Sequence, residues 1–288
     1  MGSSPTPGTM VLPALPAGLR TRIAPTPSGP LHLGNGAAFV LTWKLARAAG
    51  GRILLRIDDL DAERARTTHV EDIFRSLEWL GIDWDEGPTG PGDFAKNGSQ
   101  HLRLDGYAAL LDRLKDTGLV YACSCTRTTM ASCTCRAHGL PLETPDVLWR
   151  LGLEGGGPVS MRIWPDGSDL LEPSALMPDP VIRQRSVRPA YQVASLADDL
   201  DAGINFIVRG ADLLPSTACQ LFMAKYLGER GFQEAAFVHH KLLTDARGAK
   251  LSKSAGAGSL HDMRSAGVDP QLVHQQADRL LAELLGQA

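Results

Sequence analysis

Apolar residues along the chain recur at two spacings, and each spacing predicts one kind of element. A return every three or four residues indicates one face of an amphipathic helix, and a short unbroken run indicates a buried strand. Helices are expected over residues 37–49, 67–80, 102–119 and 216–227, and strands near 22–24, 51–57, 159–164 and 204–208. A further strand from Tyr191 is expected to lead into an acidic turn at Asp198 and Asp199. Elements in this order predict an α/β fold whose parallel sheet binds ligands at the carboxyl ends of its strands.

The same pattern divides the chain of 288 residues into five parts. A first part rich in Pro, Ser and Gly is expected to be a disordered tail. Two halves of one core then flank a middle block rich in Cys, Gly and Pro, which is expected to be an inserted module. A short helical remnant follows. The expected bounds are 1–20 for the tail, 21–100 and 191–260 for the core, 101–190 for the module and 261–288 for the remnant.

A turn rich in Pro and Gly precedes the first predicted helix. Residues 22–31 indicate a short strand that breaks into this turn, and Gly34 opens the helix. A helix N-terminus presents unpaired N–H groups and a partial positive charge, which suit a phosphate group. His32 can add a hydrogen-bond donor there. By itself a His-x-Gly turn is also common as plain structure.

Two lysines lie three residues apart in a later segment. Lys250 and Lys253 stand between Gly248 and a stretch of Ala, Gly and Ser, so both are expected on a mobile loop. Mobile lysines can follow negative charge as it builds on a departing pyrophosphate. A lysine-rich loop alone is usually a solvated surface. The turn and the lysine loop together predict a protein that handles the triphosphate of ATP.

As a pair in this order, the two segments resemble the signature motifs of class I aminoacyl-tRNA synthetases. The chain is similar to the glutamyl-tRNA synthetase group of that class over roughly residues 20–260. The resemblance rests on Arg22-Ile23-Ala24-Pro25-Thr26-Pro27-Ser28-Gly29, His32-Leu33-Gly34-Asn35, Leu55-Arg56-Ile57-Asp58-Asp59-Leu60-Asp61, Tyr191 and Val208-Arg209-Gly210-Ala211-Asp212. It implies a Rossmann-like catalytic core with a parallel sheet and an inserted acceptor-binding module that carries a zinc knuckle.

Within this group the chain resembles the truncated paralogues. Only 34 residues follow Ser254, so no anticodon-binding domain is expected. The resemblance implies that glutamate is activated with ATP and Mg²⁺ and esterified onto the queuosine base in the anticodon loop of tRNA(Asp). The usual acceptor, a 3′-terminal adenosine, is not expected. The protein is expected to act as a monomer.

The resemblance also implies which residues carry each task. Catalysis on the phosphates is expected from His32, Asn35, Lys250 and Lys253, and ATP contacts from Pro25, His32, Gly34, Asn35 and Lys253. Substrate contacts are expected from Arg22, Ala24, Thr26, Asp58, Tyr191 and Arg209. No general base is needed, because the attacking carboxylate is already ionised at pH 7. The remaining tasks are alignment and charge stabilisation.

A glutamate pocket needs a cation for each carboxylate and an anion for the ammonium, because a buried unpaired charge is costly. By the resemblance, Arg22 and Arg209 contact the carboxylates and Tyr191 supplies a hydroxyl. Asp58 stands where the group usually has a glutamate that holds the α-ammonium. Aspartate is one methylene shorter, a change that shifts discrimination by about 1–3 kcal/mol. The contact then needs a water or a shifted substrate, unless Asp59 and Asp61 carry part of it; the alternative is that these two are solvated turn residues.

Four of the five cysteines lie within thirteen residues, as the two Cys-x-Cys pairs Cys123, Cys125, Cys133 and Cys135. In a reducing compartment such close thiolates are better satisfied by zinc in a tetrahedral site than by disulfides. The tyrosine ligand usual in this group is replaced by Ala131. Cys133 is the simplest substitute and His138 a second candidate. A knuckle that no longer binds metal is the alternative.

Net charge and hydropathy argue against two kinds of protein, a nonspecific nucleic-acid binder and a membrane protein. A net charge of −3 and a pI of about 6.2 lack the basic balance of a nonspecific nucleic-acid binder. Arg183, Arg185 and Arg188 nevertheless lie close together before Tyr191, as a local basic strip or as a solvated turn. The chain has no 18-residue apolar run and no charged-then-apolar leader, so a cytoplasmic protein without a membrane span is expected.

Two other functions stay open at the level of sequence. The first is an adenylating enzyme that delivers an amino acid to a carrier protein or a small metabolite, which the departures at Asp58 and Ala131 favour. The second is a noncatalytic paralogue that keeps the scaffold. The presence of His32, Lys250 and Lys253 argues against it, because such a protein has no need for a mobile phosphate clamp.

Overall fold

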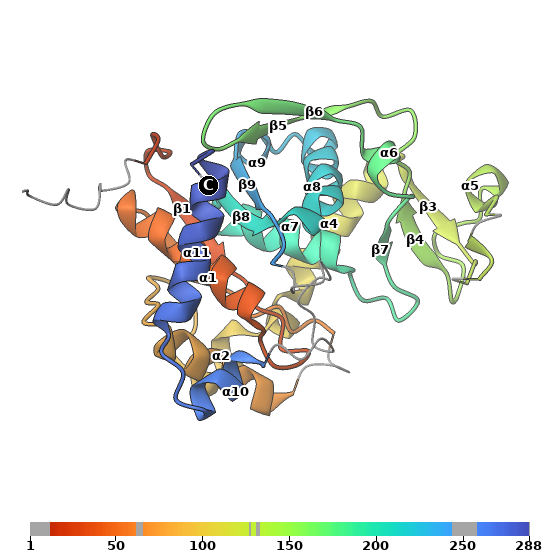
Figure 1. Cartoon of the computed structure of the whole chain (residues 1–288). Helices are drawn as coiled ribbons and strands as arrows, with labels where there is room; N and C mark the ends of the chain where they lie inside the picture. The colour runs from red at the N-terminus through yellow and green to blue at the C-terminus, as the bar shows by residue number, and fades with distance from the viewer. Residues whose placement is uncertain (1–11, 62–65, 127, 131–132, 244–257, 288) are drawn as a thin grey trace, which may run out of the picture.

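The computed structural model describes residues 12–61, 66–126, 128–130, 133–243 and 258–287. Figure 1 shows a core of strands and helices with a smaller module of strands, β3, β4 and β7, at one side. Within the described residues, no helix is long and apolar enough to cross a membrane.

Parallel strands form the centre of the core, as the alternating pattern predicts. β1 (Arg20–Ile23) pairs with β2 (Arg52–Leu55), and β8 (Phe206–Gly210) pairs with β9 (Ala236–His240). The two pairs meet where Asn205 exchanges hydrogen bonds of 2.8 and 3.1 Å with the backbone of Arg20. The carboxyl ends of β1 and β8 therefore lie at one edge of the core.

The long helices follow the apolar spacing closely. The helices α1 (Leu33–Ala48), α2 (Thr67–Trp79), α4 (Leu104–Asp116) and α8 (Leu214–Leu227) confirm the four predicted ones to within a few residues. Shorter elements are α3 (Pro91–Asp93), α5 (Cys135–His138), α6 (Pro173–Leu176), α9 (Arg230–Gln233), α10 (Leu260–Ser265), and the single turns Phe94–Gly98, Gln100–Arg103 and Ala211–Leu213. A longer helix, α11 (Gln271–Leu284), ends the described chain.

One predicted element is wrong in type. The segment from Tyr191, expected to be a strand with an acidic turn, is the helix α7 (Tyr191–Asp201). Its apolar residues do recur at helical spacing, as Val193, Leu196, Ala197 and Leu200. Residues 192–199 are nevertheless all buried, including Asp198 and Asp199. The prediction was wrong because it assigned the two buried acids to an exposed turn.

The middle of the chain contributes to two different sheets. β3 (Val120–Cys123), β4 (Leu148–Leu151) and β7 (Val181–Arg183) form an antiparallel sheet in the module. The predicted strand near 159–164 is β5 (Val159–Ile163), which forms a hairpin with β6 (Ser168–Leu171). β5 also pairs in parallel with β9, so this part of the range expected for the module extends the core sheet.

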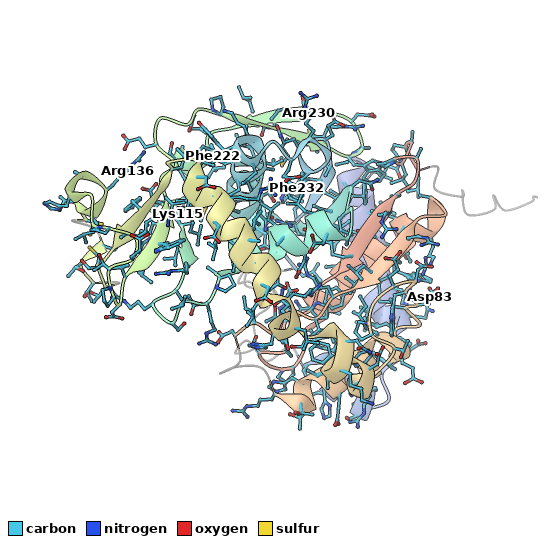
Figure 2. The ribbon with its side chains drawn as sticks, turned by 180° about the vertical axis from the view of Figure 1, so that it is seen from behind. Asp83, Lys115, Arg136, Phe222, Arg230 and Phe232 are labelled. Carbon is cyan, nitrogen blue, oxygen red and sulfur yellow. The ribbon has the colours of Figure 1, made fainter. Side chains whose placement is uncertain are left out.

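The apolar interior has two clusters. One contains Phe222 and Phe232, which are labelled in Figure 2 and are 0% and 2% exposed. The other surrounds α1 and includes Leu19, which is 1% exposed. Trp164 donates from Nε1 to the carbonyl of Ala14 at 3.1 Å. Residues 12–20, which were expected in the tail, therefore pack on the core, because their apolar side chains find a surface there.

Helix α11 lies along α1 (Figure 1). A Cβ at Gly36 would lie 3.0 Å from the Val273 side chain and 3.1 Å from that of Leu260, so glycine allows the close approach. Trp43 and His274 meet edge to face with ring centroids 6.3 Å apart. The helix that follows the first motif is thus covered by the last helix described.

Candidate functional site

A cavity of about 380 Å³ opens at the carboxyl ends of β1 and β8, beside the N-termini of α1 and α7. This volume is in the usual range for small-molecule sites. Among the residues predicted from the sequence, its lining includes Arg22, Ala24, Pro25, Thr26, His32, Asn35, Asp58, Tyr191 and Arg209. The structure therefore brings together side chains up to 187 positions apart, although their roles stay predictions. Lys250 and Lys253 lie outside the described residues.

His32 caps α1 in a reciprocal arrangement with Asn35. The backbone N–H of Asn35 donates to Nδ1 of His32 at 3.3 Å, and Oδ1 of Asn35 accepts from the backbone N–H of His32 at 3.1 Å. With Nδ1 assigned as an acceptor, a neutral ring carries its proton on Nε2, the form that donates to a phosphate oxygen. Gly34 is not in the cavity lining; a Cβ there would lie 3.1 Å from the His32 ring.

The chain that follows the lysine segment returns to the first motif. The backbone N–H of Leu260 donates to the carbonyl of Leu31 at 2.7 Å, and Ser259 forms an isolated bridge with His32. Ser259 also caps α10, with its Oγ accepting from the backbone N–H of Asp262 at 3.1 Å. The chain is therefore joined to the first motif six residues after Lys253.

Arg209 presents a buried cation to the cavity. It is 4% exposed, and its Nη1 donates to Thr217 Oγ1 at 3.2 Å and to Gln220 Oε1 at 2.9 Å. Its Nε and Nη2 are buried without a hydrogen-bond partner among the described residues. Burial lowers the pKa of Arg209 to about 10, and the side chain stays charged at pH 7. Both partners of Nη1 are neutral, so the guanidinium has unused capacity for a carboxylate.

Neutral groups behind Arg209 hold it in place. Thr217, which accepts from Arg209, also lies 2.9 Å from Nε2 of His239. Burial, followed by the charges of Arg209 and His240, lowers the pKa of His239 to about 4. The imidazole is therefore neutral at pH 7, and His239 adds no positive charge beside the guanidinium.

Asp199 is the central anion of the site. Its Oδ1 accepts from Arg22 Nε at 3.1 Å and from Arg56 Nη1 at 2.7 Å. Burial alone would raise the pKa of Asp199, but the charges of Arg22, Arg56 and Arg209 lower it below the ordinary value. One carboxylate thus links the ends of β1 and β2 to α7.

Asp58, the predicted partner of the α-ammonium, already has a cation. Its Oδ1 and Oδ2 accept from Arg56 Nε and Nη2 at 2.6 and 3.1 Å. Asp59 is not in the cavity lining; its oxygens accept from Ser99 Oγ at 2.6 Å and from the backbone of Gln100 at 2.8 Å. Among these two acids, only Asp58 is placed to meet a ligand in the cavity.

Several site residues were missed by the sequence reasoning. Arg56 lines the cavity, and Asp198 lies behind it, with bonds from Tyr107 at 2.8 Å and Gln100 at 2.9 Å. Burial raises the pKa of Asp198, against the opposing charges of Arg56 and Arg103. The sequence did contain a signal for Asp198, because Asp198 and Asp199 stand together among apolar residues. Carboxylates buried in such a segment need polar or charged partners.

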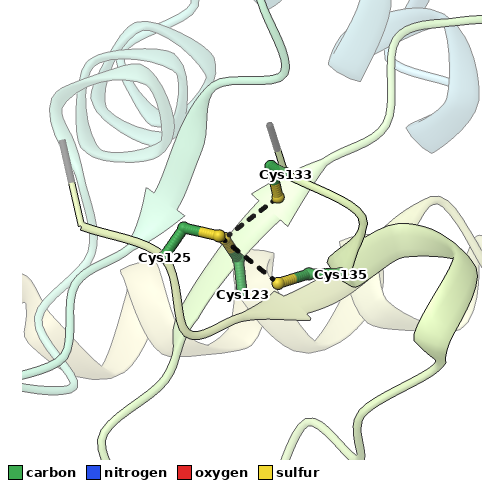
Figure 3. Close-up of side chains that lie close together, drawn as sticks. All are labelled: Cys123, Cys125, Cys133 and Cys135. Atoms are coloured by element: carbon green, nitrogen blue, oxygen red, sulfur yellow. Dashed lines mark hydrogen bonds between the residues drawn. The ribbon is translucent and has the colours of Figure 1, made fainter. Parts of the chain in front are cut away.

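The four clustered cysteines converge on one point (Figure 3). All four Sγ atoms lie within 4.8 Å of one another, with 3.7 Å between Cys123 and Cys133 and 3.6 Å between Cys125 and Cys135. Tetrahedral zinc with Zn–S bonds of about 2.3 Å needs sulfurs about 3.8 Å apart. The donor set therefore fits zinc. Of the two candidates for the remaining ligand, Cys133 lies with the other three thiols. Nδ1 of His138 lies 3.2 Å from Thr134 Oγ1 instead.

Comparison with known proteins agrees with this geometry. The family described as tRNA synthetases class I (E and Q), catalytic domain, matches residues 18–141 and 168–282. The chain is 38% identical over 273 residues to the glutamyl-Q tRNA(Asp) synthetase of Nitratidesulfovibrio vulgaris, covering 87% of this chain and 82% of that relative. It is 35% identical to glutamate–tRNA ligase 2 of Ruegeria sp., covering 90% of this chain and 60% of the ligase.

A solved structure shows the same fold. The glutamate-tRNA synthetase of Elizabethkingia anophelis superposes with a TM-score of 0.69 and 26% identity, over 86% of this chain and 54% of that one. The predicted α/β class I architecture is thereby confirmed. Because the family model matches most of its length, the chain belongs to the class I tRNA synthetases (E and Q).

Proposed function

We propose that the protein activates glutamate with ATP and transfers the glutamyl group to the queuosine base in the anticodon loop of tRNA(Asp). The observation that carries the first step is Arg209, a buried guanidinium at the cavity whose Nε and Nη2 have no hydrogen-bond partner in the described part of the chain. A carboxylate is the ligand that best satisfies such a fork. Arg22 and Tyr191 line the same cavity and give the ligand further polar contacts.

The charge around the cavity favours an acidic amino acid. Arg22, Arg56, Arg103 and Arg209 face the carboxylates of Asp58, Asp198 and Asp199, so this set of four cations and three anions has one positive charge in excess. Glutamate carries one net negative charge at pH 7 and cancels that excess, whereas glutamine does not. This balance supports glutamate over its amide.

The phosphates of ATP are proposed to meet the N-terminus of α1. His32 and the backbone N–H groups of the first turn supply donors there, and the positive end of the helix favours an anion. Lys250 and Lys253 are proposed to act on the same phosphates, because the chain after them joins the first motif at Leu31 and Leu260. ATP is proposed to enter as its Mg²⁺ complex, with the metal neutralising phosphate charge.

The acceptor is proposed from similarity. The relative from Nitratidesulfovibrio vulgaris, most of whose length the chain covers, is named a glutamyl-Q tRNA(Asp) synthetase. Zinc held by Cys123, Cys125, Cys133 and Cys135 is proposed to shape the module, because these thiols lie outside the cavity lining. A monomer suffices, since residues of one chain line the cavity.

ATP–pyrophosphate exchange with glutamate, glutamine or aspartate tests the first step, without tRNA and then with queuosine-containing tRNA(Asp). We expect exchange with glutamate alone. Labelled glutamate should then pass to queuosine-containing tRNA(Asp) and not to the same tRNA without queuosine. Exchange without transfer would favour a carrier protein or metabolite as acceptor, and no exchange under any condition would refute glutamate activation.

A variant locates the carboxylate site. Arg209→Gln should raise the KM for glutamate about a hundredfold, since losing one partner of a buried charge pair costs about 3 kcal/mol. The KM for ATP should change little. Arg230→Gln is the matched control, because Arg230 is an exposed arginine at the start of α9 and outside the cavity lining.

A further inference from the structure

A tight hairpin turn joins β7 to α7 at the edge of the module. The backbone N–H of Gln184 donates to the carbonyl of Arg188 at 2.8 Å, and that of Val187 donates to the carbonyl of Gln184 at 2.9 Å. Arg183 and Pro189 form an antiparallel bridge at the base of the turn. We call residues 184–188 the β7–α7 hairpin.

Val187 at the tip of the hairpin has a costly backbone conformation. Its φ is +66°, in the left-handed region that a β-branched residue rarely adopts. Its side chain is 65% exposed, so burial does not compensate for this conformation. Strained positions of this kind cluster at ligand-binding segments.

The hairpin carries two arginines in different situations. Arg185 is held by the knuckle: its Nη2 donates to the carbonyls of Ser124 and Cys125 at 2.7 and 3.0 Å. Arg188 donates from Nε to Ser186 Oγ at 3.3 Å and has no acidic partner within the described ranges. One arginine thus anchors the hairpin, and the other remains available for an external anion.

The hairpin lies beside the mouth of the cavity. Tyr191 lines the cavity and is 41% exposed, and it follows Arg188 by three residues. Three residues span at most about 10 Å of chain. A large acceptor that enters the cavity past Tyr191 therefore comes close to Arg188 and Val187.

We propose that the β7–α7 hairpin contacts RNA, with Arg188 pairing with a phosphate and Val187 packing on a base next to the one that enters the cavity. This inference rests on the proposed function, because it takes the acceptor to be a base in an RNA loop. Proteins commonly read such loops by splaying bases out and holding the adjacent phosphates with arginine. An exposed apolar tip suits that partner, beside an arginine that has no acidic partner among the described residues.

The test measures binding of the queuosine-containing anticodon stem-loop of tRNA(Asp) to the full chain, at several salt concentrations. Arg188→Gln should raise the Kd about tenfold, as expected for a lost hydrogen bond to a charged group. The slope of log affinity against log salt should become shallower by about 0.7, the value for one phosphate contact in a single strand. Glutamate-dependent ATP–pyrophosphate exchange without RNA should be unchanged.

Two further variants make the result specific. Arg230→Gln removes one positive charge from α9, which Figure 1 shows at the top of the molecule, away from the hairpin below β7, and its Kd should match that of the wild type. Val187→Gly should weaken RNA binding about threefold through lost apolar contact, while thermal unfolding shows that the fold is retained.

Several results would overturn the inference. An unchanged Kd for Arg188→Gln, or an equal loss for Arg230→Gln, would remove the specific role of the hairpin. Wild-type protein that performs glutamate-dependent exchange but does not bind the stem-loop would also overturn it, and glutamate activation would still stand. Failure of exchange in the wild type, with stem-loop binding weakened only by the hairpin variants, would instead refute the proposed activation and support the RNA contact.

Discussion

Gln220 offers a sharp test of how Arg209 selects its ligand. Its Oε1 accepts from Nη1 of Arg209 at 2.9 Å, the shorter of the two bonds at that nitrogen. Gln220→Met keeps the size of the side chain and removes the acceptor. A hydrogen bond to a charged group contributes about 1.5–3 kcal/mol. We therefore expect the KM for glutamate in pyrophosphate exchange to rise about tenfold or more, with the KM for ATP unchanged.

Gln220→Glu separates electrostatics from simple packing. The new carboxylate can still accept from Arg209, so the unfolding free energy should stay at or above that of Gln220→Met. It also opposes the substrate carboxylate across the guanidinium, where two charges about 7 Å apart at an effective dielectric of about 20 repel by roughly 2 kcal/mol. The KM for glutamate should then rise about 30-fold above the wild-type value.

Gln233→Met provides the control, because Gln233 Nε2 donates to a backbone carbonyl, that of Ala224, at 3.2 Å. Denaturant unfolding and exchange kinetics on the three variants measure both effects. The reasoning is refuted if Gln220→Glu has a glutamate KM within twofold of wild type. It is also refuted if the KM values for ATP and glutamate rise together.

Three further predictions follow from local geometry. Val187→Gly should raise the unfolding free energy by about 0.5–1 kcal/mol, since relief of left-handed strain outweighs the added chain entropy of glycine; lower stability in denaturant would contradict this. Zinc analysis should find about one ion per chain in the wild type and in His138→Ala, and a loss in Cys133→Ser; equal zinc in all three would exclude Cys133 as a ligand. The pKa of His239 is lowered to about 4 in the folded protein, so as the pH falls the unfolded chain binds a proton at His239 before the folded protein does. About 3 kcal/mol of stability should therefore be lost between pH 6.5 and 4. His239→Gln should reduce this loss, and an unchanged pH profile of stability in that variant would refute the reasoning.

The sequence predicts local features of the site well. The turn, the helix that follows it and His32 at the helix start all depend on neighbours within a few positions. The His32–Asn35 capping pair is also local, at a separation of three residues. The cysteine set could be predicted as well, because four thiols in thirteen residues cannot lie far apart.

Long-range contacts could not be predicted in the same way. Asp199 and Arg22 are 177 residues apart, and only the meeting of β1 with α7 brings them together. The type of α7 was missed for a related reason: its acids are buried in ion pairs, so they resemble a turn in sequence while lying inside a helix. Their partners could be identified only after the topology was known.

Helix α11, which packs on α1, is among the last parts of the chain to be synthesised, whereas α1 and the first motif are among the first. Val273, Ala277, Leu280 and Leu281 belong to the same apolar cluster as the buried face of α1. During synthesis that face stays uncovered until residues 271–284 have left the ribosome, although His32 was made long before. A nascent chain that stalls earlier exposes apolar surface, and the helix behind the cavity lacks its cover. Acquisition of a stable site is therefore expected to be a late event in synthesis.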